Sequence, residues 1–205
     1  GTESVTQTVN VSISAVNDTP ITDATSSLSV TEDTAVNGSI TATDIDGDTL
    51  SYTYSTPSKG TVAQTTAGSY TYTPTTNATG ADSFTATVSD GTSTDVVQTV
   101  SVSITAINDT PITDATSSLS VTEDGAASGS ITATDIDGDT LSYTYSTPSK
   151  GTIVSDNGSY IYTPTANVTG ADSFTVVVSD GTESVTQTVN VSISAVNDTP
   201  ITDAT

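Results

Sequence analysis

The sequence predicts an all-β protein, built as tandem seven-stranded Greek-key β-sandwiches joined end to end, and three observations support this prediction. Residues that favour strands, namely Thr, Val, Ile and Tyr, dominate the 205 residues, whereas strong helix formers are scarce. Apolar and polar residues alternate along short segments, which is the pattern of a strand with one buried face. Long stretches of sequence also recur, so the chain repeats one structural unit.

The repeats are long and nearly identical. Residues 18–61 match residues 109–152 at 41 of 44 positions, and residues 1–25 recur unchanged as residues 181–205. The motif Asn-Asp-Thr-Pro marks the end of each unit, at Asn17, Asn108 and Asn197, so the units are 91 and 89 residues long. A unit of this length exceeds the roughly 20–45 residues of a solenoid repeat, which indicates separate domains in series.

These repeats divide the chain into four segments. We expect residues 1–19 to be the last strand and linker of a preceding module, followed by a complete module in residues 20–110. A second complete module follows in residues 111–199, and residues 200–205 begin the next one. The chain is therefore expected to be part of a longer array.

Each strand is identified by apolar residues two positions apart. In the first module these are, in chain order, Leu28 and Val30; Ile40 and Ala42; Leu50, Tyr52 and Tyr54; Val62; Tyr70 and Tyr72; Phe84, Ala86 and Val88; and Val100, Val102 and Ile104. Turn-forming residues stand between them, as in Asp46-Gly47-Asp48, Thr56-Pro57, Ala67-Gly68 and Asp90-Gly91. Seven short strands in about 90 residues are typical of an immunoglobulin-like sandwich.

Charge and composition exclude several functions. The chain has 24 acidic and 2 basic residues, a net charge of −22, and neither Cys nor His. Zinc sites of thiolate or imidazole type, haem ligation, disulfides and His-dependent catalytic triads are therefore impossible. So acidic a surface repels nucleic acid and anionic membranes, and no apolar run reaches the roughly 18 residues of a spanning helix. We expect neither a nucleic-acid partner nor membrane insertion.

The acidic residues gather in loops at both ends of each predicted sandwich. Because antiparallel strands alternate in direction, successive loops lie at alternate ends. One end of module 1 collects Glu32, Asp82 and the linker after the last strand. The other end collects the loop residues Asp44, Asp46, Asp48 and Asp90.

Stacking of the two modules would bring these two kinds of end together. The residues that would meet at this joint are Glu32, Asp82, Asn108, Asp109, Asp135, Asp137, Asp139 and Asp180. Like charges at about 4 Å repel by roughly 4 kcal/mol near a protein surface, so a cation is needed to neutralise them. Calcium fits best, because it takes about six to eight oxygen ligands in a tolerant geometry, and magnesium is the second choice. The loop is not an EF-hand, since its Gly is the fourth residue and the twelfth is Ser55.

Several motifs occur together in the order and spacing of a known repeat. They are Val30-x-Glu32-Asp33, Ala42-Thr43-Asp44-x-Asp46-Gly47, Leu50-x-Tyr52, Val88-x-Asp90-Gly91 and Asn17-Asp18-x-Pro20. Both complete modules thereby resemble cadherin repeats, above all the bacterial cadherin-like tandem repeats of very large RTX-type surface adhesins. The resemblance implies a cadherin- or immunoglobulin-like fold, calcium ions shared between neighbouring modules, and a role in cell adhesion.

The resemblance also implies ligands for Ca2+, position by position. At the central joint these are Glu32, Asn108, Asp109, Asp135, Asp137 and Asp180, with Asp139 from the same loop. The first joint keeps Asn17, Asp18, Asp44, Asp46 and Asp90, with Asp48 from its loop, and the last keeps Glu123, Asn197 and Asp198. Asp82 and Asp172 stand near the place of a further cadherin glutamate. Ala106 replaces a cadherin linker Asp, so we expect fewer ions per joint than in cadherins.

We therefore expect calcium-rigidified extender repeats of a secreted bacterial cell-surface adhesin, which project a distal ligand-binding domain in adhesion and biofilm formation. The partners would be neighbouring repeats of the same chain, joined through calcium-bound linkers, and the chain would be monomeric and extracellular. One alternative is a cadherin-like module that binds carbohydrate or a second copy of itself. A third hypothesis is an enzyme with paired carboxylates, but we expect no catalysis, because these acids lie at joints rather than in a cleft.

Overall fold

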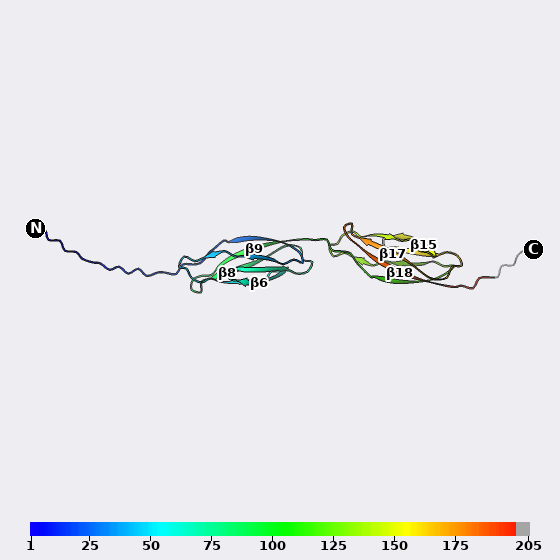
Figure 1. Ribbon diagram of the computed structural model, residues 1–205, viewed down its shortest axis with the longest axis horizontal. Helices are drawn as coiled ribbons and strands as arrows, with labels where there is room; N and C mark the ends of the chain where they lie inside the picture. The colour runs from blue at the N-terminus through cyan, green and yellow to red at the C-terminus, as the bar shows by residue number, and fades with distance from the viewer. Residues whose placement is uncertain (200–205) are drawn as a thin grey trace, which may run out of the picture. The chain divides into compact units, whose positions relative to one another are not determined.

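The computed structural model describes residues 1–199 and contains two compact units, Gly1–Ile107 and Asn108–Thr205 (Figure 1). Both units are built from β-strands, as the sequence predicts. The part of the chain that the structure describes has no helix that could cross a membrane. Residues 200–205, predicted as the start of a further module, lie outside the described residues.

Unit 1 contains two sheets and one short strand pair. Its strands are β1 (Ile21–Thr22), β2 (Thr25–Thr31), β3 (Val36–Ser39), β4 (Ala42–Thr43), β5 (Ser51–Tyr54), β6 (Gly60–Thr66), β7 (Ser69–Pro74), β8 (Gly80–Ser89) and β9 (Val96–Thr105). The order in the four-stranded sheet is β2-β9-β8-β5, the three-stranded sheet is β3-β7-β6, and β1 pairs with β4. All seven predicted strands are present, and the first two are each divided into two pieces.

The pairing of the first long strand with the last one defines the topology of the four-stranded sheet. β2 runs parallel to β9, in a register that joins Thr25 to Thr99 and Thr31 to Thr105. The neighbouring pairs β8–β9 and β5–β8 are antiparallel. Because parallel strands end on the same side, the residues that follow β2 and β9 emerge close together. Glu32, directly after β2, accordingly donates its backbone N to Thr105 O at 3.0 Å.

Unit 2 repeats this architecture in the same order. Its strands are β10 (Ile112–Thr113), β11 (Thr116–Thr122), β12 (Ala127–Ser130), β13 (Ala133–Thr134), β14 (Ser142–Tyr145), β15 (Gly151–Asp156), β16 (Ser159–Pro164), β17 (Gly170–Ser179) and β18 (Ser184–Ser194). The sheets are β11-β18-β17-β14 and β12-β16-β15, with β10 paired to β13. The parallel pair is β11 with β18.

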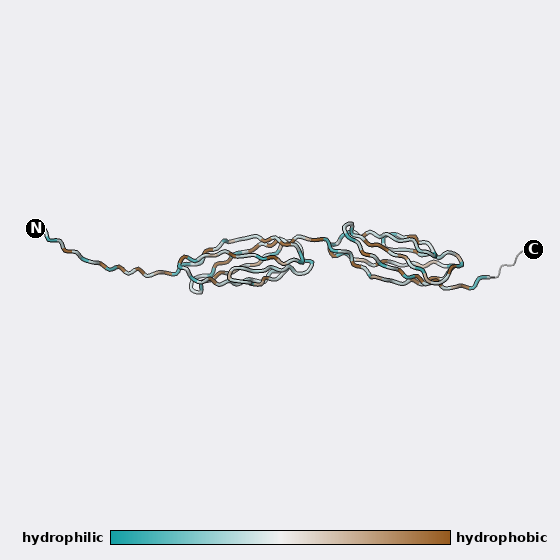
Figure 2. The backbone as a smooth tube through the Cα atoms, in the orientation of Figure 1, coloured by the Kyte–Doolittle hydropathy of each residue, from teal (hydrophilic) through white to brown (hydrophobic). Residues whose placement is uncertain are grey.

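The facing sides of the two sheets form the core of each unit. In unit 1, Tyr72, Val88 and Val100 are fully buried, and the Phe84 ring packs edge-on against Tyr70 with the ring centroids 5.2 Å apart. Buried and exposed residues alternate along β8 and β9, and Figure 2 shows hydrophobic residues interspersed with hydrophilic ones along the strands. Unit 2 has the same core at the equivalent positions, so the sequence period of two produces both sandwiches.

Identical sequences adopt different structures at two places in the chain. Residues 184–194 form β18, which pairs with β17 on one side and β11 on the other, and Val189 is fully buried there. Residues 4–14 have the same sequence but form no strand, and Val9, the counterpart of Val189, is 73% exposed. A strand needs neighbours to pair with, and the described residues provide none for residues 4–14.

Candidate metal centre

Unit 1 carries a loop with three aspartates directly after β4. Asp44, Asp46 and Asp48 each offer a carboxylate oxygen, and these oxygens lie within 4.8 Å of one another. The loop is folded around Asp44, whose Oδ1 accepts hydrogen bonds from the backbone N of Asp46 at 2.9 Å and of Asp48 at 3.3 Å. Gly47 has a φ of 82°, a conformation that glycine adopts without strain, so the turn can be this tight.

The linker before β1 and the turn after β8 are joined to this loop. Asp18 donates its backbone N to Asp46 Oδ2 at 2.7 Å, and Asn17 Nδ2 donates to Asp90 Oδ2 at 2.9 Å. Hydrogen bonds lower the pKa of Asp90, and the Ser93 hydroxyl is the largest cause. Unit 1 therefore brings the three loop aspartates together with the predicted linker and turn residues.

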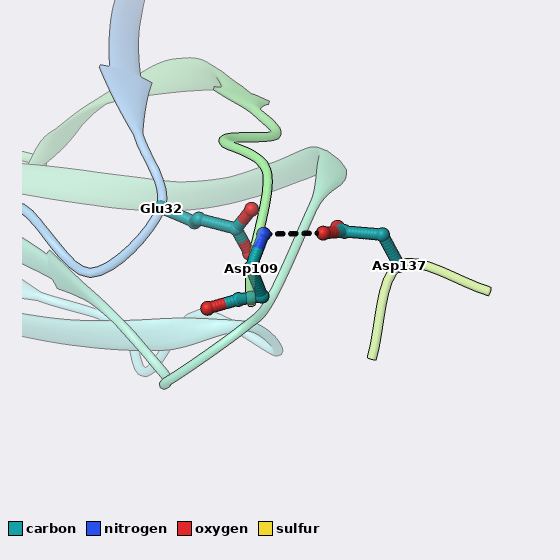
Figure 3. A group of neighbouring side chains, drawn as sticks. All are labelled: Glu32, Asp109 and Asp137. Carbon is teal, nitrogen blue, oxygen red and sulfur yellow. Dashed lines mark hydrogen bonds between the residues drawn. The ribbon is translucent and has the colours of Figure 1, made fainter. Parts of the chain in front are cut away.

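Unit 2 repeats this arrangement with its own residues. Asp109 donates its backbone N to Asp137 Oδ2 at 2.7 Å, the hydrogen bond drawn in Figure 3, and Asn108 Nδ2 donates to Asp180 Oδ2 at 3.0 Å. The Asn108 amide is also the largest cause of the lowered pKa of Asp180. Asp135 Oδ1 accepts two hydrogen bonds from the loop backbone, at 3.0 and 3.2 Å. The clustered loop carboxylates are those of Asp135, Asp137 and Asp139.

One oxygen in each loop has no protein hydrogen-bond partner. Asp44 Oδ2 and Asp135 Oδ2 are shielded from solvent, and no described residue donates a hydrogen bond to either. A buried polar atom without a partner costs roughly 1–3 kcal/mol, and more when it is charged. A bound cation would remove this penalty, and carboxylate and carbonyl oxygens are the ligands that calcium prefers. The donor set of both loops therefore fits calcium.

No basic side chain compensates these aspartates. Lys59 and Lys150 are the two basic residues of the chain. Lys59 Nζ donates to the backbone O of Thr79 at 2.6 Å, and Lys150 Nζ donates to Thr169 O at 3.0 Å. Thr79 comes directly before β8 and Asp90 directly after it, so Lys59 and the turn aspartate Asp90 lie at opposite ends of this strand.

The other end of each unit holds a buried glutamate. Glu32 is 2% exposed, and its Oε1 accepts the backbone N of Ile107 at 2.8 Å (Glu32 is drawn in Figure 3). Glu123 is 6% exposed, and its Oε1 accepts the backbone N of Val196 at 2.8 Å. The parallel strand pair explains both contacts, because it brings the residue after the first strand next to the residues after the last one.

The last predicted pair, Asn197 and Asp198, is exposed after β18. Asn197 Nδ2 donates to the backbone O of Asp198 at 3.3 Å, and the same hydrogen bond forms after Asn17 and Asn108, at 3.1 and 3.2 Å. This hydrogen bond joins neighbouring residues, so the repeated Asn-Asp-Thr-Pro motif forms it at each linker.

Asp82 occupies a different setting from the predicted one. The sequence places it in a turn, whereas the structure makes it the third residue of β8, because pairing with β9 already begins at Gly80. Its Oδ1 accepts the backbone N and Oγ of Ser58, at 3.0 and 2.8 Å. Its Oδ2 accepts the backbone N of Lys59 at 3.0 Å and the Tyr72 hydroxyl at 2.7 Å. Four donors therefore occupy this carboxylate.

Asp172 has the same four donors in unit 2, from Ser149, Lys150 and Tyr162. Burial alone raises the pKa of both aspartates, but the hydrogen bonds outweigh it and lower the pKa of Asp82 and Asp172 to about 2. Each carboxylate is thus ionised and holds the loop before β6 or β15 against the sheet. This structural role is a reason to leave both residues out of a metal-ligand set.

A polar pair in the core of each unit was not predicted. Gln98 and Gln187 are 3% and 2% exposed and stand in phase with the apolar residues of β9 and β18. Thr22 Oγ1 lies 3.1 Å from Gln98 Oε1, and Thr113 Oγ1 lies 2.8 Å from Gln187 Oε1. These contacts tie β1 to β9 and β10 to β18. The sequence did contain an indication of this pair, because each glutamine stands at a position where the alternating pattern otherwise has an apolar, buried residue.

Two family descriptions match this chain, one over each unit. Residues 17–106 match the bacterial cadherin-like domain, and residues 108–192 match the bacterial Ig domain. The chain therefore carries a bacterial cadherin-like domain and a bacterial Ig domain in tandem. No curated protein matches the chain.

Solved structures of cadherins are similar to this fold. A human protocadherin-24 structure with domains EC1-2 is 20% identical, with a TM-score of 0.57, and the match covers 88% of this chain and 100% of that one. Protocadherin gamma B2 domains 1–5 are 17% identical, with a TM-score of 0.59, over 87% of this chain and 40% of that one. The chain spans 29% of the endo-fucoidan hydrolase MfFcnA4 of glycoside hydrolase family 107, at 22% identity and a TM-score of 0.42. At these identities the cadherin likeness shows the fold alone, namely two cadherin-like β-sandwich domains in tandem.

Proposed function

We propose that the chain is a calcium-stiffened extender segment of a bacterial cell-surface adhesin, which holds a distal binding domain away from the cell. The observation that carries this proposal is the shielded, unpartnered carboxylate oxygen in each three-aspartate loop. With 24 acidic and only 2 basic residues, the chain needs a counter-charge from outside. Calcium matches the available ligands, which offer oxygen and neither imidazole nor thiolate.

The proposed ligands come from the loop, turn and linker of each unit. In unit 1 they are Asn17, Asp18, Asp44, Asp46, Asp48 and Asp90, and in unit 2 they are Asn108, Asp109, Asp135, Asp137, Asp139 and Asp180. Glu32 would add a ligand from the preceding unit, because it holds the backbone of Ile107, which is two residues before Asp109 in the chain. Glu123, Asn197 and Asp198 would serve a following module in the same way.

Calcium bound in this way would stiffen the connection between modules. Residues 106–111, between β9 and β10, belong to no strand. An ion that binds ligands before and after this linker would remove its rotational freedom and relieve the repulsion between the acids. A ligand that binds only the folded state also raises the free energy of unfolding, by about 2.7 kcal/mol at a hundredfold excess over its Kd.

Sequence repetition favours a spacer over a recognition or catalytic module. Residues 18–61 and 109–152 are identical at 41 of 44 positions, which suits a part whose length matters more than its surface. Bacterial cadherin-like and Ig domains are typical of secreted and surface proteins, which supports an extracellular location. In this proposal the chain belongs to an RTX-type adhesin that acts in biofilm formation, binds neighbouring repeats through calcium, and catalyses no reaction.

Solution scattering and thermal unfolding test this function. With millimolar calcium we expect the scattering of a stiff, extended particle, and with a chelator a broader distribution of end-to-end distances. The Tm should rise by about 10 °C or more with calcium, and by less with magnesium. The double variant Asp44→Asn/Asp135→Asn keeps the size of both loops and should lose most of the response. Identical scattering and melting curves with calcium and with chelator would refute the proposal.

A further inference from the structure

The two units differ in the turn that follows the turn aspartate, Asp90 or Asp180, beside the proposed metal site: the turn of unit 1 is one residue longer and carries the exposed Asp95, which has no acidic counterpart in unit 2. Their aspartate loops are identical in sequence, as are the linker motifs Asn-Asp-Thr-Pro at residues 17–20 and 108–111. The third residue after the turn aspartate, however, is Ser93 in unit 1 and Glu183 in unit 2. This difference changes the hydrogen bonds of the turn aspartate itself.

In unit 1, the Ser93 hydroxyl donates a hydrogen bond to the turn aspartate, Asp90. Asp90 Oδ2 accepts hydrogen bonds from Ser93 Oγ at 2.5 Å and from Asn17 Nδ2 at 2.9 Å. Asp90 Oδ1 accepts the backbone N of Thr92 at 2.7 Å and of Ser93 at 2.8 Å. All four usual acceptor positions of the carboxylate are therefore in use. A metal ion must displace the serine hydroxyl before it can bind Asp90.

In unit 2, the equivalent oxygen is more accessible to an ion. Among the described residues, Asp180 Oδ2 accepts one hydrogen bond, from Asn108 Nδ2 at 3.0 Å. Glu183 donates its backbone N to Asp180 Oδ1 at 2.7 Å, as Ser93 does in unit 1. The Glu183 carboxylate instead reaches the linker, where the Thr110 hydroxyl donates to its Oε2. Glu183 thus leaves one position of Asp180 open and adds a negative charge beside the linker.

We infer that this position sets the calcium affinity of each unit, with serine giving a weaker site and glutamate a stronger one. Two effects act in the same direction. An open Asp180 oxygen can bind the ion directly. The Glu183 carboxylate also places its charge against Thr110 of the linker, next to Asp109, whereas Asp95, the additional acid of the unit 1 turn, is exposed, so Glu183 increases the local attraction for a cation. The inference rests on the proposed calcium binding and names the residue whose identity would make the calcium affinity differ between modules.

Calcium titration of the full chain, followed by the backbone amide NMR signals of Gly47 and Gly138, tests this inference. Each glycine lies in one of the aspartate loops, so each site gives its own apparent Kd. Because Glu32 can contribute to only one of the two sites, each variant is compared with the same site in the unmodified chain. We expect Ser93→Glu to lower the Kd at Gly47 about tenfold and Glu183→Ser to raise the Kd at Gly138 about tenfold.

Two further variants separate the causes. Ser93→Ala frees Asp90 without adding charge, so the Kd at Gly47 should fall by a smaller factor, about threefold. Glu3→Ser removes the same charge as Glu183→Ser, but from the identical segment that forms no strand. We expect Glu3→Ser to leave the Kd unchanged at both glycines.

The outcomes of these titrations distinguish a failure of this inference from a failure of the proposed calcium-dependent function. If both glycines respond to calcium but Ser93→Glu and Glu183→Ser each leave the Kd within about twofold, the inference is overturned and the proposed function stands. If neither glycine responds to millimolar calcium, both the inference and the proposed function fail.

Discussion

Asp82 and Asp44 have different surroundings, which decide what each side chain does. Asp82 has four hydrogen-bond donors, whereas Asp44 keeps one shielded oxygen without a protein donor among the described residues. In the sequence both are simply acids near the end of a strand. The donors to Asp82 come from Ser58, Lys59 and Tyr72, which are 24, 23 and 10 residues away. Local sequence therefore could not separate the structural aspartates from the candidate ligands.

We expect Asp82→Asn to lower the free energy of unfolding of unit 1 by about 1–3 kcal/mol. The new amide nitrogen would face an N–H or O–H donor, so at least one of the four donors loses its acceptor. Urea unfolding in the presence of a chelator measures the loss without any contribution from calcium. Asp95→Asn, the same substitution at an exposed aspartate, is the matched control. Equal stability of the two variants would show that the four hydrogen bonds contribute nothing.

The same carboxylates predict a loss of stability in acid. The pKa of Asp82 and Asp172 is about 2 in the folded chain against an ordinary 3.8, so between these values the unfolded chain binds more protons. Their contribution is complete above about pH 5 and is lost as the pH falls through about 2. In the double variant Asp82→Asn/Asp172→Asn, the free energy of unfolding should therefore fall less steeply from about pH 5 to pH 2. Parallel slopes for variant and unmodified chain would contradict this prediction.

Strands follow from the alternation of apolar residues, but their pairing depends on distant parts of the chain. All seven predicted strands of a module form, since the period of two survives in the structure. Residues 4–14 and 184–194 show the limit, because one sequence forms a paired strand in one place and no strand in the other. The buried pairs of Thr and Gln show the same limit, since the partners are 76 and 74 residues apart.

Thr113→Val tests whether the polar pair holds the short strand β10 in place. The substitution keeps the shape of the side chain but removes the hydroxyl that lies 2.8 Å from Gln187 Oε1, at a residue that is 2% exposed, and 3.0 Å from the backbone O of Thr132. We expect unit 2 to lose about 1–2 kcal/mol of its free energy of unfolding. Amide hydrogen exchange should become faster in β10 and its partner β13, while β1 and β4 of unit 1 serve as the internal reference. Unchanged exchange in β10 would mean that backbone pairing alone fixes this strand.

For the molecule as a whole, the sequence predicts the fold and the class of domain better than the geometry of the candidate site. Repeats and charge indicate an acidic array that needs a cation, and the family matches confirm tandem bacterial cadherin-like and Ig domains. Alternating strand direction predicted that the loop and turn aspartates lie at one end of a module, whereas the linker residues were added to them by the expected stacking of modules and by the resemblance to cadherin repeats. The orphan oxygens of Asp44 and Asp135, and the contrast between Ser93 and Glu183, depend on side-chain conformation, which spacing alone does not determine.

β2 and β9 bear the load when unit 1 is pulled from both ends of its chain. Tension draws the start of β2 one way and the end of β9 the other. Since the two strands run in the same direction, their seven residue pairs, from Thr25–Thr99 to Thr31–Thr105, are sheared together rather than unzipped one after another. Rupture of many hydrogen bonds at once takes more force than their sequential opening. A tether built from such units would therefore stay folded under a pulling force, such as the drag of flowing liquid, that would open a sheet whose strands separate one hydrogen bond at a time.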